Sequence, residues 1–262
     1  MIDYHTHTAL CNHARGTPLD YIHAAMEKGL SQICFLDHLT FAEDFRNSMQ
    51  PAEVPLYFHM IQELKHAFTG QIQVKVGMEV DYNPEQLDLC LSILEPFDWD
   101  VIAASVHYIG GLNFVSRRSR AELVGWGEDK ILESYLDKVE ALLEGDWFDF
   151  VCHLDVFKKF GAPFPHTLPP QINRILDLMA EKNIALELNT SGMRHAAGQY
   201  YPDSVILREA HRRGVKAVLG SDAHTSDEVG FQWKEALVKL KRAGFDHIQG
   251  YSKRVPEVIP IP

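Results

Sequence analysis

The sequence contains 262 residues, of which 46% are hydrophobic and 23% are charged. This composition is typical of a globular protein and excludes a disordered chain or a small disulfide-stabilised domain. The 25 basic and 36 acidic side chains give a net charge of -11, without the broad basic face that phosphate backbones require, so we expect no nucleic-acid partner.

Short apolar segments alternate along the chain with longer segments of helical pattern. The expected strands are residues 1–4, 32–36, 74–78, 101–106, 150–152, 185–188 and 217–219. Each is short and mostly apolar, as strands buried on both faces are. The expected helices are residues 18–28, 55–68, 128–143, 170–182, 203–213 and 228–243, and several have proline near the start or glycine after the end.

Seven strands, most of them followed by a helix, predict a parallel sheet with right-handed crossovers. At this length the sheet closes most naturally into a (β/α) barrel, and an open doubly wound sheet is the alternative. Because no linker or low-complexity segment divides the sequence, we expect one domain over residues 1–262. Residues 252–262 contain three prolines and suit a terminal extension.

The four cysteines are Cys11, Cys34, Cys90 and Cys152, and they form no C-x-x-C pair. The last three lie in or beside apolar segments, which is typical of buried free thiols. We therefore expect a reducing, cytoplasmic location. The chain shows no secretory signal pattern and no apolar segment long enough to cross a membrane, so we expect no membrane partner. The sequence leaves the oligomeric state open.

The 14 histidines are unevenly distributed. Histidines and carboxylates recur at the C-terminal ends of the expected strands, namely Asp3, His5, His7, Asp37, His38, Glu79, His107, His153, Asp222 and His224, with His13 in the loop after the first strand. In a barrel these strand ends converge on one face. Unpaired buried imidazoles and carboxylates are costly, so core packing does not explain them. Imidazole and carboxylate ligands suit zinc, iron or manganese, and their number predicts two or three ions.

Six motifs follow one another between residues 3 and 224. They are Asp3-Tyr4-His5-Thr6-His7, Leu36-Asp37-His38, Gly77-Met78-Glu79, Ser105-Val106-His107, His153-Leu154-Asp155 and Gly220-Ser221-Asp222-Ala223-His224. In this combination and order, the chain resembles the polymerase and histidinol phosphatase (PHP) superfamily. The resemblance implies a single metal-dependent phosphoesterase domain with a distorted (β/α)7 barrel, in agreement with the seven expected strands.

The resemblance also implies a site for three divalent transition-metal ions, zinc, iron or manganese. Its ligands would be His5, His7, Glu79 and Asp222 for the first ion, Glu79, His107 and His153 for the second, and His13, His38 and His224 for the third. Asp3 and Asp37 would orient His5 and His38 by accepting their outer N–H groups, or would instead bind backbone amides. Asp155 would hold His153 or contact the substrate.

Two further segments resemble the histidinol-phosphate phosphatase branch of this superfamily: Cys11-Asn12-His13-Ala14 and residues 187–194. In that branch, an arginine of the second segment and a basic residue after the His-Leu-Asp motif hold the substrate phosphate. Arg194 fills the first position, and Lys158 or Lys159 fills the second, where the branch has arginine. His195 could face the site or lie away from it. Arg117 could belong to a second anion patch or to a solvated helix start.

We therefore expect a metal-dependent phosphomonoester hydrolase, with L-histidinol phosphate of histidine biosynthesis as substrate. A metal-bridging hydroxide would attack the phosphorus. The segment after His107 departs from the branch, so another small ester, such as a nucleotide or sugar phosphate, is an alternative substrate. A proofreading nuclease is a further alternative, which the acidic charge disfavours. A non-catalytic module that binds metal or phosphate is the alternative of another class.

Overall fold

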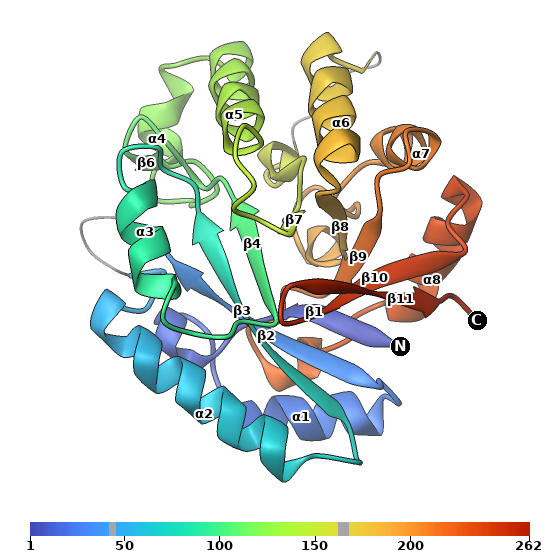
Figure 1. Cartoon of the computed structure of the whole chain (residues 1–262). Helices are drawn as coiled ribbons and strands as arrows, with labels where there is room; N and C mark the ends of the chain where they lie inside the picture. Colours follow the sequence, from blue (N-terminus) through green and yellow to red (C-terminus); the bar gives the residue numbers. More distant parts are fainter. Residues whose placement is uncertain (42–45, 162–167) are drawn as a thin grey trace.

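The computed structural model describes residues 1–41, 46–161 and 168–262. Within these residues, seven parallel strands form one sheet, in the order β1 Ile2–Thr6, β2 Gln32–Leu39, β3 Gln73–Asp81, β4 Val101–Ser105, β7 Phe150–Val151, β8 Ala185–Asn189 and β9 Ala217–Gly220 (Figure 1). The chain just after β9 returns to β1, where the amide of His7 donates to the carbonyl of Ala223 at 2.9 Å. The sheet is thereby nearly closed, which confirms the expected (β/α)7 barrel over the open sheet.

Helices surround this sheet on the outside (Figure 1). They are α1 Pro18–Glu27, α2 Val54–Ala67, α3 Leu87–Leu94, α4 Arg120–Val124, α5 Glu128–Leu142, α6 Pro170–Lys182, α7 Ser204–Arg212 and α8 Trp233–Ala243. Short 3-10 helices lie at Ala9–Cys11, Pro51–Glu53, Val156–Lys158, Ser191–Arg194 and Ser226–Glu228. No helix of the described residues has the length and the apolar character needed to cross a membrane.

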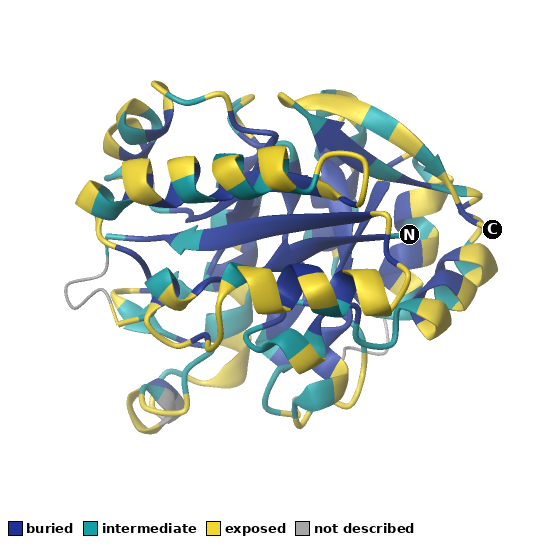
Figure 2. Ribbon diagram, turned by 90° about the horizontal axis from the view of Figure 1, so that it is seen from below, coloured by how far each residue is buried: buried dark blue, intermediate teal, exposed yellow. Residues whose placement is uncertain are grey.

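Burial of one helical face against the sheet explains the outer layer. Helix α6 buries Ile172, Ile175, Leu176 and Met179, which recur at helical spacing on one face. Figure 2 shows the same division for the whole molecule, with buried strands inside and helices exposed on their outer sides. The core therefore lies within and around the barrel wall, and the strand ends remain available for polar side chains.

Helix α8 begins at Trp233, although the sequence pattern predicts a start at residue 228. Gly230 and Gln232 have φ values of 61° and 50°, which no α-helix accommodates. The sequence pattern also gave no signal for α3, α4 or the small hairpin of β5 Tyr108–Ile109 and β6 Leu112–Asn113. All of these elements are short, so they have little periodicity.

Residues 252–262, expected as a terminal extension, instead include a strand. β10 His247–Ser252 and β11 Val255–Pro260 form an antiparallel hairpin. The amide of Tyr251 donates to the hydroxyl of Tyr4 at 2.8 Å, and Glu257 pairs with the buried Lys75 of β3 at 3.2 Å. These partners lie near the beginnings of β1 and β3, so the hairpin covers the N-terminal end of the barrel. Proline is tolerated here because β11 is an edge strand.

Candidate metal centre

The C-terminal end of the barrel gathers all nine expected metal ligands into one cluster, namely His5, His7, His13, His38, Glu79, His107, His153, Asp222 and His224. His5, His38 and Glu79 lie within β1, β2 and β3, and the others lie in the segments that follow the strands. Strand register contributes directly, because β2 and β3 pair His38 with Glu79.

Glu79 lies at the centre of the cluster and is completely buried. Its Oε2 atom is 3.2 Å from Nε2 of His5 and 2.8 Å from Nδ1 of His38. Its Oε1 atom is 3.2 Å from Nε2 of His153 and 3.9 Å from Nε2 of His107. The two oxygens thus face different histidines, so each could contribute to a metal site.

Asp222 faces the same Nε2 atom of His5 as Glu79 does. Its Oδ1 atom is 3.2 Å from Nε2 of His7, 3.9 Å from Nε2 of His5 and 3.5 Å from Nδ1 of His224. The φ angles of Asp222 and His153 are 55° and 27°, which are unfavourable for residues with a side chain. Such strain concentrates at functional sites, where the surrounding structure enforces it.

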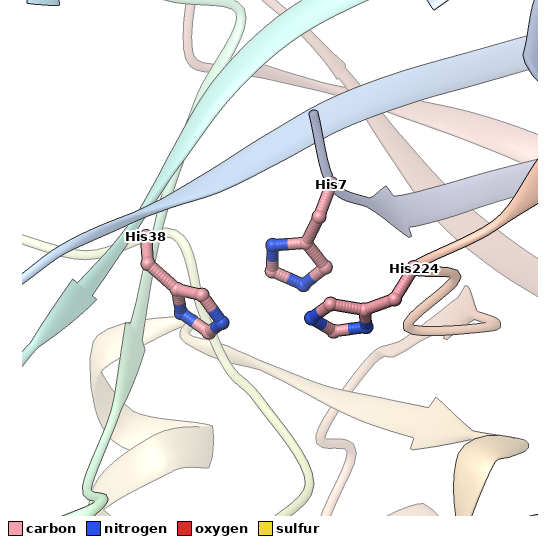
Figure 3. A group of neighbouring side chains, drawn as sticks. All are labelled: His7, His38 and His224. Carbon is pink, nitrogen blue, oxygen red and sulfur yellow. The ribbon is translucent and has the colours of Figure 1, made fainter. Parts of the chain in front are cut away.

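A group of imidazole rings extends the cluster towards the surface. The ring centroids of His7 and His224 are 4.2 Å apart, those of His7 and His38 are 4.3 Å apart, and those of His13 and His224 are 4.4 Å apart. Figure 3 shows His7, His38 and His224 turned towards one another from three different segments. Burial lowers the pKa of His38 to about 4 and that of His224 well below its usual range. Both imidazoles are therefore neutral and have a free lone pair at pH 7.

Several ring nitrogens in this cluster are buried without a hydrogen-bond partner. Among the described residues these include Nδ1 and Nε2 of His7 and Nε2 of His224. The groups His7–His38–His224 and His5–His7–Asp222 each offer ligand atoms that lie within 4.8 Å of one another. An unpaired buried polar atom is costly, and a bound cation would satisfy these nitrogens. Nitrogen and carboxylate donors in this arrangement fit zinc, iron or manganese.

The electrostatics of the cluster also favour a cation. Burial alone would raise the pKa of Glu79, but His38 and His5 hold it well below its usual range. Burial alone would lower the pKa of His5, but Glu187 and Glu79 together raise it well above its usual range. The carboxylates of Glu79 and Glu187 thus flank His5, and they stabilise positive charge between them, whether a proton or a metal ion supplies it.

Glu187 of β8 is a buried site residue to which the sequence analysis gave no role. Its Oε1 atom is 2.7 Å from Nδ1 of His5, and its Oε2 atom accepts the amide of His153 at 2.9 Å and the side-chain amide of Asn189 at 3.0 Å. A Cβ atom at Gly220 would lie 2.2 Å from this carboxylate, so glycine is required opposite it. One signal was available, because Glu187 is a charged residue within an apolar expected strand.

Asp3 and Asp37 differ from the expected orienting role. Asp3 accepts hydrogen bonds from the amides of Ser221 at 2.9 Å, Gly230 at 2.7 Å and His5 at 3.3 Å. It therefore binds backbone amides, which was the alternative to the orienting role. Asp37 accepts the amides of His38 at 3.0 Å and Thr8 at 3.1 Å. The imidazole nitrogen facing Asp37 is Nδ1 of His7, at 3.6 Å, rather than a nitrogen of His38.

Asp81, at the end of β3, orients a histidine ring, which is the role expected of Asp3 and Asp37. One of its oxygens accepts the amide of His107 at 2.9 Å, and the other is 3.4 Å from Nδ1 of the same ring. This contact orients Nε2 of His107 towards Glu79. The residue stands two positions after Glu79, on the same face of the strand, and this spacing was the available signal.

Arg194 lies beside the loop that carries Asp222. Its Nη2 atom donates to the carbonyls of Ser221 at 3.0 Å and Asp222 at 2.9 Å, and its Nε is 3.1 Å from Glu228. The remaining Nη1 atom is buried and has no hydrogen-bond partner among the residues that the structure describes. Glu228 also accepts the amide of His224 at 2.9 Å. The guanidinium is thus fixed next to the cluster with one donor to spare.

The two candidate lysines have different surroundings. Lys158 is buried, pairs with Asp155 at 2.7 Å and donates to the carbonyl of Tyr200 at 2.9 Å. Asp155 also accepts the amide of Asp203 at 2.8 Å. This ion pair therefore holds the start of α7, which differs from the expected contact of Asp155 with His153 or substrate.

Lys159, in contrast, lies within electrostatic reach of the cluster. Burial lowers its pKa, Asp222 opposes this shift, and Arg117, which is exposed, adds to it. Burial also lowers the pKa of His195 to about 4, with Lys159 and Arg194 adding to the effect and Asp222 opposing it. Lys159 and His195 therefore both lie within electrostatic reach of Asp222, whereas Lys158 is held by its ion pair with Asp155.

Comparison with known proteins places this cluster in a family context. Residues 3–191 match the model of the PHP domain. A protein from Deinococcus radiodurans named "Probable histidinol-phosphatase" is 36% identical over 246 residues, which cover 93% of this chain and 94% of the relative. Histidinol-phosphatase of Bacillus subtilis is 28% identical over 262 residues, which cover 90% of this chain and 97% of that protein.

A solved structure has the same fold. The crystal structure of histidinol phosphate phosphatase from Lactococcus lactis, complexed with zinc, L-histidinol and phosphate, superposes with a TM-score of 0.82 at 23% identity and covers 98% of both chains. The family match, which extends from the first strand to the 3-10 helix after β8, includes most of the clustered ligands. The chain belongs to the family of proteins with a PHP domain.

Proposed function

We propose that this protein is a metal-dependent phosphatase that hydrolyses L-histidinol phosphate to L-histidinol and phosphate, a step of histidine biosynthesis. The observation that carries the proposal is the convergence of seven histidines with Glu79 and Asp222 at one end of the barrel. Relatives that match almost the full length of the chain have names that specify this activity. Their names support the choice of substrate, and the cluster supports the chemistry.

In this proposal three divalent ions occupy the cluster. Their ligands are His5, His7, Glu79 and Asp222 for the first, Glu79, His107 and His153 for the second, and His13, His38 and His224 for the third. Zinc is the ion named with the Lactococcus structure, and these donors suit it. When bound, the ions act as Lewis acids on the phosphate and activate water. Glu187 and Asp81 keep the rings of His5 and His107 in the orientation that binding needs.

The phosphate group is held by side chains beside the first ion. Arg194 supplies one positive charge beside Asp222, with its guanidinium fixed by the carbonyls of Ser221 and Asp222 and by Glu228. Lys159 supplies a second positive charge, and His195 and Arg117 lie near it. Lys158 is excluded from this role because its ammonium group is already paired with Asp155. A lysine contributes charge but no bidentate contact.

The alcohol part of the substrate lies in a polar groove of about 1160 Å³ whose lining includes His13 of the metal cluster. Asp81, Asn83, Tyr108 and Asn113 also line this groove. The last two belong to the β5–β6 hairpin, the segment that departs from the histidinol-phosphate phosphatase branch. Amide and hydroxyl groups of this kind suit an amino alcohol with an imidazole ring.

The proposal includes a cytoplasmic location and a small phosphorylated compound as the partner. All four cysteines are buried and free, which agrees with a reducing compartment.

The test is phosphate release from L-histidinol phosphate beside nucleotide, sugar and amino-alcohol phosphates, with the metal content of the same sample measured. We expect a strong preference for L-histidinol phosphate. Turnover of another ester, with L-histidinol phosphate left intact, would keep the metal chemistry and refute the substrate. A fully metal-loaded protein without turnover would instead indicate a binding module.

A further inference from the structure

A cleft of about 450 Å³ lies between helices α7 and α8, on the outside of the barrel. Arg208 of α7 and Lys239 and Arg242 of α8 line it. In the part of the chain that the structure describes, none of these cations has a carboxylate within ion-pair distance. The protein as a whole carries a net charge of -11, so this group of unpaired positive charges stands against an acidic background.

Lys239 is held in place at this cleft. Its ammonium donates to the hydroxyl of Ser204 at 2.7 Å and lies 5.2 Å from the centroid of the Tyr200 ring. Burial lowers its pKa, Asp203 opposes this shift, and Arg208 adds to it by a smaller amount. Neighbouring cations repel one another, and a bound anion would remove this repulsion and would replace the water that the partly buried ammonium of Lys239 has lost.

The walls of the cleft are largely apolar. Leu207, Val238 and the ring of Tyr200 line it together with the cations, and Glu235 is the carboxylate among the lining residues. A space of this kind fits an anionic head group on an apolar body better than a free inorganic ion. None of the lining residues belongs to the metal cluster, so this cleft is a site separate from the metal centre.

We propose that the cleft between α7 and α8 binds a small organic anion. Its phosphate or carboxylate group contacts Arg208, Lys239 and Arg242, and its apolar part packs against Tyr200 and Val238. Charge-assisted contacts of arginine with such groups are strong enough to give specific binding. The inference does not depend on the reaction at the metal centre.

Calorimetric titration of the metal-loaded protein tests this, with phenylphosphonate and benzoate as separate probes. We expect at least one probe to bind the cleft in addition to the metal centre. The variant Arg208→Ala/Arg242→Ala weakens the additional binding about tenfold or more and leaves turnover of L-histidinol phosphate unchanged. The control Arg212→Ala/Lys234→Ala removes exposed cations of the same helices that do not line the cleft, and it keeps both binding events.

The two probes distinguish the head group. Binding of phenylphosphonate alone assigns a phosphate compound, and binding of benzoate alone assigns a carboxylate. The proposal is overturned if neither probe binds outside the metal centre, or if the cleft variant binds both probes as the unaltered protein does. Since both arginines are exposed, we expect the variant to fold, and its melting temperature shows whether it does.

Discussion

Replacement of Glu187 by glutamine should weaken metal binding although Glu187 is not among the metal ligands proposed above. In the structure this carboxylate holds Nδ1 of His5 at 2.7 Å and the amide of His153 at 2.9 Å. Those two histidines face different oxygens of Glu79, so one buried group orients ligands of two ions. Glutamine keeps the size of the side chain but loses the charge and one acceptor oxygen.

The expected magnitude follows from these contacts. A hydrogen bond to a charged group contributes about 1.5–3 kcal/mol. A loss of 1.4 kcal/mol is about tenfold in affinity, so metal affinity should fall by roughly 10- to 100-fold, the range typical of residues that orient histidine ligands. We expect no complete loss, because Glu187→Gln leaves His5, His153 and Glu79 themselves in place.

The assay is competition for zinc against a chelator of known affinity, with the melting temperature measured in parallel. Asp149→Asn is the matched control, because Asp149 is a largely buried carboxylate that holds Arg254 and the amide of Ile102, far from the cluster. This control should lower stability and leave metal affinity unchanged. Equal metal affinity for Glu187→Gln and the unaltered protein, within about twofold, would refute the reasoning.

Other predictions follow from the same geometry. The variant His5→Ala/His7→Ala should lose bound metal and phosphatase activity together, as metal analysis and phosphate release would show; activity without metal would contradict the ligand assignment. Lys159→Ala should lower kcat/KM about 10- to 100-fold with little change in melting temperature. Lys158→Met should chiefly destabilise the protein, by about 3–5 kcal/mol, because it leaves Asp155 buried and unpaired. A loss of kcat/KM in Lys158→Met at unchanged stability, together with full kcat/KM in Lys159→Ala, would refute the choice of Lys159. The pKa of His195 is about 4 in the folded protein, below its ordinary value of 6.5, so the unfolded chain takes up a proton first as pH falls. The neutral ring thus contributes fully to stability above pH 6.5, and this contribution is lost as pH falls towards about 4. Denaturant unfolding should show a smaller loss over that window for His195→Gln, and an unchanged pH profile would count against the shift.

The barrel and the convergence of the expected ligands were predictable because both depend on local patterns. Apolar segments such as residues 32–36 and 74–78 mark buried parallel strands, and the carboxyl ends of such strands converge. His38 and Glu79 therefore had to be neighbours once β2 and β3 were placed side by side, and the register confirms it.

The supporting contacts were not predictable, because they join residues that are distant in sequence. Asp3 stands two residues before His5 but binds Ser221 and Gly230, since the return of β9 to β1 brings those amides to it. The carboxylate that holds the His5 ring comes instead from Glu187, on β8. Which carboxylate contacts the His5 ring therefore depends on how the strands close into a barrel.

The sequence did not predict the hairpin β10–β11 for a related reason. Prolines in residues 252–262 lack amide donors, and they are a poor signal for a strand. The segment forms one because its partner β10 and the buried Lys75 at the barrel end supply the pairing.

Metal dependence of the hydrolysis of L-histidinol phosphate tests the central claim most directly. Phosphate release should be measured on one sample as prepared, after metal removal by a chelator, and after stepwise return of zinc, iron or manganese. The account predicts that activity disappears with the metal and returns in proportion to the ions bound, up to three per chain. Undiminished hydrolysis by protein shown to contain no metal would contradict it.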